Sequence, residues 1–85
     1  MDFPWKHPHP RIWLCECSPR GDYRLRIEML IAPSDKTLSY VVTAEWLIGG
    51  SDYLTHTASL DTAHHEAEQW AREYEAQDAD KDGAA

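Results

Sequence analysis

The sequence predicts an α+β fold, namely a three- to four-stranded antiparallel meander with one C-terminal helix packed on one face. Apolar residues alternate along residues 11–60, and they recur at helical spacing from there on. A length of 85 residues suits a single domain with a small core. We expect this domain at residues 11–76, between an extended arm at 1–10 and an acidic tail at 77–85.

The arm has an unusual composition. Three prolines occur among its ten residues, together with Phe3 and Trp5. Proline fixes the backbone and removes an amide donor, so the segment is predicted to be extended and not helical. Its two aromatic side chains need an apolar surface, which either the domain's own sheet or a partner supplies.

Four segments carry strand signals. Residues 11–17 (RIWLCEC) begin the sheet, and SPRGD supplies a turn. Residues 23–31 and 38–46 alternate between apolar and polar side chains. Residues 53–60 are expected to form a fourth, short strand with Leu54, His56, Ala58 and Leu60 on one face. The clearest apolar face comprises Tyr23, Leu25, Ile27, Met29 and Ile31.

The helix follows Leu60, with Asp61 or Thr62 as the expected N-cap. Its apolar stripe comprises Ala63, Ala67, Trp70, Ala71 and Tyr74. The opposite side carries Glu66, Gln69, Glu73 and Gln77, flanked by Glu68 and Glu75. Arg72 follows Glu68 by one helical turn and is therefore predicted to pair with it.

Charge is distributed unevenly. Residues 1–43 contain five acids and six bases, a net charge of +1, whereas residues 44–85 contain ten acids and two bases, a net charge of −8. These two values sum to the net charge of −7 for the chain. The asymmetry predicts a directional electrostatic surface. Neither an apolar membrane segment nor a signal-peptide pattern is present in the sequence, so we expect a cytoplasmic protein.

Two sets of residues have the chemistry of metal ligands. Asp78, Asp80, Asp82 and Gly83 match the first half of an EF-hand loop, but the later ligands are missing, so a solvated acidic helix end is expected instead. His7, His9, Cys15 and Cys17 are zinc-ligand types, but the two cysteines alternate on a strand and are expected to be reduced core residues. We therefore predict no metal site and no cofactor.

Three further patterns have plainer explanations. The adjacent His64 and His65 lack the spacing of a metalloprotease helix. The RGD tripeptide at residues 20–22 occurs where a hairpin needs a turn. Arg20, Arg24 and Arg26 could contact phosphates, but they can equally pair with Glu28 and Glu45 across the sheet. We expect ion pairing and no direct binding of nucleic acid.

No catalytic motif is recognisable, so we predict a binding protein and not an enzyme. The first hypothesis is docking of the acidic helix and tail on a basic surface of a partner. The residues expected to bind are Glu66, Glu68, Glu73, Glu75, Asp78, Asp80 and Asp82. The alternative is an antitoxin or regulatory adaptor that binds one protein through the sheet edge or through Phe3 and Trp5. Either a monomer or a homodimer is compatible with the sequence.

The layout of the chain resembles a known class of proteins. A short single domain, a meander followed by SLDTAHHEAEQWAREYEAQ, and an acidic end are similar to the small phage-encoded inhibitors of bacterial defence, anti-CRISPR proteins among them. The resemblance implies an inhibitor in the host cytoplasm that occupies the nucleic-acid or partner site of a nuclease complex. It implies no catalytic residue.

Overall fold

The computed structural model describes residues 3–84, with side chains described through Gln77. Five strands form one antiparallel sheet in which each strand pairs with its neighbours in sequence. The elements are β1 (Trp5–His9), β2 (Ile12–Cys15), β3 (Tyr23–Ile31), β4 (Leu38–Trp46), β5 (Ser51–Thr57) and α1 (Leu60–Ala84). The predicted α+β meander with a C-terminal helix is confirmed, but the sheet has more than the expected three or four strands.

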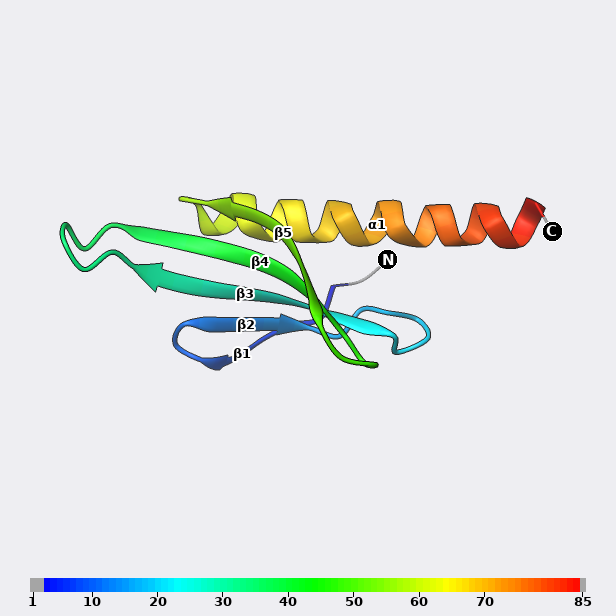
Figure 1. The fold of residues 1–85 in the computed structure, drawn as a ribbon, viewed down its shortest axis with the longest axis horizontal. Helices are drawn as coiled ribbons and strands as arrows, with labels where there is room; N and C mark the ends of the chain where they lie inside the picture. The colour runs from blue at the N-terminus through cyan, green and yellow to red at the C-terminus, as the bar shows by residue number, and fades with distance from the viewer. Residues whose placement is uncertain (1–2, 85) are drawn as a thin grey trace.

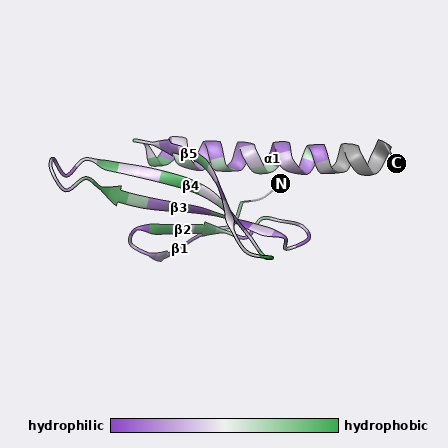
Figure 2. Cartoon of the chain, in the orientation of Figure 1, coloured by the Kyte–Doolittle hydropathy of each residue, from purple (hydrophilic) through white to green (hydrophobic). Residues whose placement is uncertain are grey.

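The helix lies along one face of the sheet, and its C-terminal part extends beyond the strands (Figure 1). The molecule is accordingly elongated, with dimensions of 53 × 23 × 20 Å. Figure 2 shows hydrophobic residues concentrated on β2 and β4, whereas α1 carries hydrophilic residues along much of its length. The fold therefore has two layers, with its core between the sheet and the first turns of the helix.

The additional strand is β1, which lies in the segment expected to be an arm. Trp5 pairs with Cys15 of β2, and the register shifts between Lys6 and His9, around Pro8. Proline cannot donate a backbone hydrogen bond, but a strand at the edge of a sheet needs such bonds on one side only. Pro8 is therefore compatible with β1 at the edge, although a proline-rich composition argues against a strand in general.

The centre of the sheet agrees with the sequence prediction. Strands β3 and β4 pair in a register that places three apolar pairs opposite each other: Tyr23 with Trp46, Leu25 with Ala44, and Ile27 with Val42. The side chains of Leu25, Ile27 and Val42 are completely buried. Each burial of this kind stabilises the fold by about 1.5–3 kcal/mol relative to an exposed side chain.

The helix contacts the sheet through small residues. Ala63, Ala67 and Ala71 are completely buried, and Trp70 and Tyr74 pack partly buried beside them. This is the predicted apolar stripe. The N-cap differs from the prediction of Asp61 or Thr62, because the helix already begins at Leu60. The hydroxyl of Ser59 accepts a hydrogen bond from the Thr62 amide at 3.3 Å, and its carbonyl accepts one from the Ala63 amide at 3.0 Å.

Strand β5 contains a local irregularity. Its register with β4 shifts between Val42 and Thr43, so the alternation of side chains is interrupted. Leu54 packs against the core, whereas His56 is exposed. The sequence prediction that these two side chains share one face is wrong, because a single extra residue in a strand reverses the faces of the residues beyond it.

The face of the sheet opposite the helix carries paired charges. Arg24 Nε lies 2.7 Å from Glu45 Oε1, and Arg26 Nη1 lies 3.1 Å from Glu28 Oε1. These are the ion pairs that the sequence predicted as the alternative to phosphate contacts. Both arginines are therefore neutralised within the sheet, and this face does not present an uncompensated basic surface at β3.

Candidate partner-binding surface

The four glutamates predicted to form one surface of the helix lie on two different flanks. Glu66 and Glu73 are exposed on the flank beside β5. There they border a shallow pocket of about 150 Å³ whose other lining residues are Leu54, Thr55, Gln69 and Trp70. Glu68 and Glu75 are half-buried and form hydrogen bonds within the protein. Gln69 Nε2 donates a hydrogen bond of 3.2 Å to Glu73 Oε1, but Glu66 and Glu73 both remain exposed, so two of the four glutamates are accessible to a partner.

Glu68 holds the N-terminal segment. Its Oε2 accepts a hydrogen bond of 2.8 Å from the indole nitrogen of Trp5, and its Oε1 lies 3.8 Å from Arg72 Nη2. The Arg72 guanidinium in turn lies 4.9 Å from the centre of the Phe3 ring. The pairing of Arg72 with Glu68 is confirmed. Phe3 and Trp5, expected as anchors for a partner under the alternative hypothesis, contact the helix of their own chain.

His64 completes the surface on which Trp5 packs. The two rings meet edge to face, with centroids 4.5 Å apart. Burial lowers the pKa of His64, although the nearby Glu68 and Asp61 carboxylates oppose this shift. A neutral imidazole therefore supports the indole ring, and His64 has a packing role here.

Glu75 binds the most buried tyrosine. Its Oε1 accepts a hydrogen bond of 2.8 Å from the Tyr23 hydroxyl, and burial together with this bond raises the pKa of Tyr23. The Tyr23 ring belongs to an aromatic cluster with Trp46, Trp70 and Tyr74, in which every pair of ring centroids is between 5.2 and 6.2 Å apart. Glu75 thus connects the helix to the end of the core.

Replacing Glu75 by alanine should therefore affect stability. The Tyr23 hydroxyl would lose its partner inside the protein, which costs about 1–3 kcal/mol, whereas Tyr23→Phe alone should cost about 1 kcal/mol. The double variant should be more stable than the sum of the two losses predicts. Urea unfolding of all four proteins measures this coupling. Additive losses would show that the hydrogen bond does not contribute.

The zinc-ligand candidates do not converge. Cys15 and Cys17 are buried in the core, and both are free thiols. Burial, followed by the neighbouring Cys17, raises the pKa of Cys15 to about 12, and burial also raises the pKa of Cys17. His7 instead stacks on Trp13 with ring centroids 4.4 Å apart. Both thiols are therefore protonated at neutral pH.

Among the described residues, no group of three or more histidine, cysteine, aspartate or glutamate side chains is arranged to hold a metal ion. The side chains of Asp78, Asp80 and Asp82, predicted both as partner-binding residues and as half of a calcium loop, lie outside the described residues. The backbone of this segment belongs to α1.

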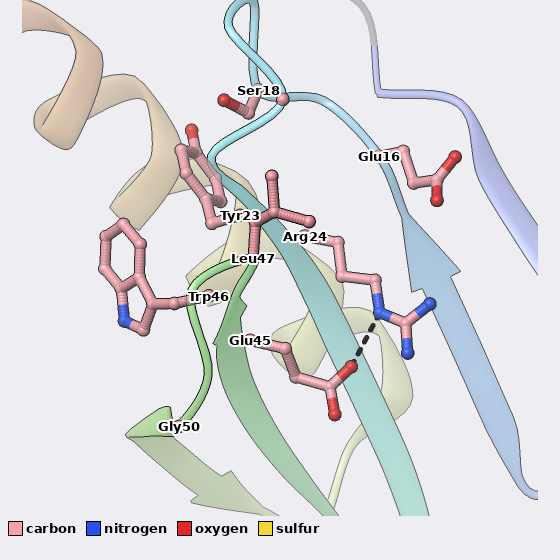
Figure 3. Close-up of a pocket in the computed structure, with 9 residues that line it drawn as sticks. Glu16, Ser18, Tyr23, Arg24, Glu45, Trp46, Leu47 and Gly50 are labelled. Carbon is pink, nitrogen blue, oxygen red and sulfur yellow. Dashed lines mark hydrogen bonds and ion pairs between the residues drawn. The ribbon is translucent and has the colours of Figure 1, made fainter.

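A second, larger hollow lies at the other end of the sheet, where the β2–β3 and β4–β5 connections meet (Figure 3). Its volume is about 650 Å³. Nine residues line it: Glu16, Ser18, Gly21, Tyr23, Arg24, Glu45, Trp46, Leu47 and Gly50. The RGD tripeptide borders this hollow through Gly21. It forms part of a turn, in which the amide of Gly21 donates to the Ser18 carbonyl and the amide of Asp22 donates to the Ser18 hydroxyl, both at 3.1 Å.

The sequence prediction did not include this end of the molecule. Leu47 and Ile48, at the tip of the β4–β5 turn, are 80% and 97% exposed. The signal was present in the sequence as LIGGSD, where two aliphatic residues stand directly before a glycine turn. In the sequence, Leu47 and Ile48 look like a continuation of the preceding strand. Only the position of the turn shows that their side chains project into solvent.

No protein-family model matches the chain, and neither a curated protein nor a solved structure matches it. No helix in the described part of the chain combines the length and apolarity needed to cross a membrane. The functional interpretation therefore depends on the surface and its charges.

Proposed function

We propose that this protein is a small inhibitor that binds another protein by docking the β5-side flank of α1, centred on Glu66 and Glu73, on a basic surface. The main supporting observation is that these carboxylates are exposed and, among the described residues, form no ion pair with a lysine or an arginine. Unpaired exposed charges of one sign attract a complementary surface over a distance and orient the encounter.

The surroundings of the two glutamates support docking. Trp70 and Leu54 line the shallow pocket beside them and supply apolar contact area. Tryptophan is frequent among the residues that contribute most to protein–protein binding. A partner with two basic side chains around one apolar side chain would match this arrangement.

The charge of the whole helix suggests the class of partner. Residues 60–84 contain eight acids and two bases, a net charge of −6. A rigid rod with this charge resembles a nucleic-acid backbone in its electrostatic field. The proposed partner is therefore a nucleic-acid-binding or nuclease complex, in line with the layout that resembles anti-CRISPR proteins. Inhibition would consist of occupying the basic site, with no chemical step.

The test begins with capture of a partner from a bacterial lysate at low salt, elution in a salt gradient, and identification of the bound protein. Its affinity is then measured for Glu66→Lys/Glu73→Lys. Reversal of two contacting charges should weaken binding by at least about 100-fold, because each like-charge contact is unfavourable. Elution at increased salt is expected, since screening weakens the attraction.

A matched control separates local contact from total charge. Asp35→Lys changes the net charge by the same amount as the single variant Glu73→Lys, which is measured beside the double variant, but Asp35 is exposed between β3 and β4 and not on the helix. It should change the affinity only slightly. Glu68 and Glu75 are left unchanged because they stabilise the fold. Unaltered affinity of the double reversal, in a protein that melts normally, would refute the proposal.

A further inference from the structure

We propose that the β4–β5 turn is the contact surface of a homodimer, in which Ile48 of each copy inserts into the hollow beside the same turn of the other copy. This interaction is separate from the acidic flank of the helix and does not depend on the function proposed above.

The projecting part of this surface is held in place by hydrogen bonds. The amide of Leu47 donates to the Asp22 carbonyl at 2.7 Å, which ties the turn to the β2–β3 connection. Within the turn, the amide of Gly49 donates to the Trp46 carbonyl at 3.0 Å, and the amide of Trp46 donates to the Gly50 carbonyl at 3.1 Å. The φ angles of Gly49 and Gly50 are +111° and +83°, so side chains other than glycine are disfavoured there. Ile48 is therefore presented outward by an ordered turn.

The receiving part lies next to it. The hollow of about 650 Å³ has Tyr23 and Trp46 in its lining and Leu47 at its wall (Figure 3). Its volume falls in the range of about 300–1,000 Å³ that is typical of sites for small molecules, which is ample for an aliphatic side chain. An exposed isoleucine and a hollow lined by aromatic, aliphatic and charged side chains thus occupy one patch of the surface.

This arrangement favours a second copy as the occupant. A twofold dimer uses the same patch on both subunits, so the patch must contain both a projection and a matching recess. When two copies meet here, the interaction forms twice. A projection without an adjacent recess would instead favour a different partner.

The distribution of charge also favours this patch over the helix as the contact between two copies. The segments that build it, residues 16–24 and 45–50, contain three acids (Glu16, Asp22, Glu45) and two bases (Arg20, Arg24), a net charge of −1. The helix, by comparison, has a net charge of −6. Two copies therefore repel each other strongly through their helices and weakly through the turn. Inside the hollow, Arg24 and Glu45 already neutralise each other at 2.7 Å, so an entering aliphatic side chain meets a paired charge there.

The first test is sedimentation velocity over a range of protein concentrations. The full chain should show a monomer–dimer equilibrium, and Ile48→Ser should raise the dimer Kd by roughly 100-fold or more, because the substitution removes two buried side chains per dimer. Leu38→Ser is the matched control, since Leu38 is 42% exposed and begins β4, whose other end leads into the β4–β5 turn. It should leave the dimer Kd unchanged.

Because Ile48 is almost fully exposed, Ile48→Ser should melt at the same temperature as the original protein when both are monomeric, which excludes unfolding as the cause. A chain that remains monomeric at all concentrations, or an equal Kd for Ile48→Ser, would overturn the proposal.

The second test locates the contact. A photoreactive benzophenone amino acid at position 48 should give a crosslinked dimer, and mass spectrometry should place the crosslink in the peptides that contain residues 16–24 or 45–47. A crosslink between copies at β1 or on the helix would refute insertion into the hollow.

Discussion

Trp70→Ala should lower the free energy of unfolding by about 3–5 kcal/mol, the usual cost of truncating a large aromatic side chain in a core. Trp70 stacks on Tyr74 with ring centroids 5.2 Å apart and contacts Tyr23 at 5.3 Å and Trp46 at 6.2 Å. The other helix residues facing the sheet are mainly alanines, which cannot fill the space that the indole leaves. Helix and sheet would therefore lose their largest common contact.

Thermal unfolding followed by far-ultraviolet circular dichroism measures the effect. A loss of this size corresponds to a decrease in Tm of roughly 12–40 °C in a domain of this length. Tyr53→Ala is the control, because Tyr53 is 66% exposed and its removal should change stability by less than about 0.5 kcal/mol. Similar melting curves for both variants would show that the aromatic cluster does not hold the helix.

Deletion of residues 1–10 should be almost as damaging, with a loss of about 4 kcal/mol or more. The deletion removes β1 from the sheet, exposes the outer edge of β2, and leaves Glu68 without the Trp5 indole that binds it at 2.8 Å. It also uncovers Cys15, the β2 residue paired with Trp5, which is completely buried in the intact protein. The expected decrease in Tm is roughly 15–30 °C.

Trp5→Phe separates the stability contributed by strand β1 from that contributed by the hydrogen bond between Trp5 and Glu68. This substitution keeps an aromatic ring and the backbone pairing but removes the indole donor to Glu68, so it should cost about 1–3 kcal/mol. Denaturant titration of both variants gives the two losses on one scale. If the truncated chain were as stable as the full chain, residues 1–10 would be an accessory arm that is free to bind a partner, and binding through Phe3 and Trp5 would be favoured.

Sequence reasoning succeeded where a pattern reports a local property. The alternation from Tyr23 to Ile31 predicted a half-buried strand, and the spacing of Ala63, Ala67 and Ala71 predicted the buried stripe of α1. Both signals arise because side-chain direction repeats with the backbone geometry of a single element. The ion pairs of Arg24 and Arg26 were also predictable, since their partners lie opposite or near them once the register is known.

Other features depended on neighbours that are distant in the sequence. The edge strand β1 forms because β2 offers an unpaired edge, which compensates for Pro8. Leu54 and His56 separate because of a register shift against β4. In both cases, the structure depends on how one strand pairs with its neighbour, and the composition of the segment itself does not predict that pairing.

The candidate binding surface likewise combines features that the sequence predicts with features that depend on long-range contacts. The antiparallel meander, the alanine-rich face of the helix, and the concentration of acids in the second half of the chain all follow from the order of the residues. Which acids a partner can reach depends on long-range contacts, because Glu68 and Glu75 bind Trp5 and Tyr23, residues 63 and 52 positions away. The tertiary structure also places Ile48 beside a hollow built from two separate turns. Charge and periodicity are properties of a chain, but availability for binding depends on how the folded chain already satisfies its own groups.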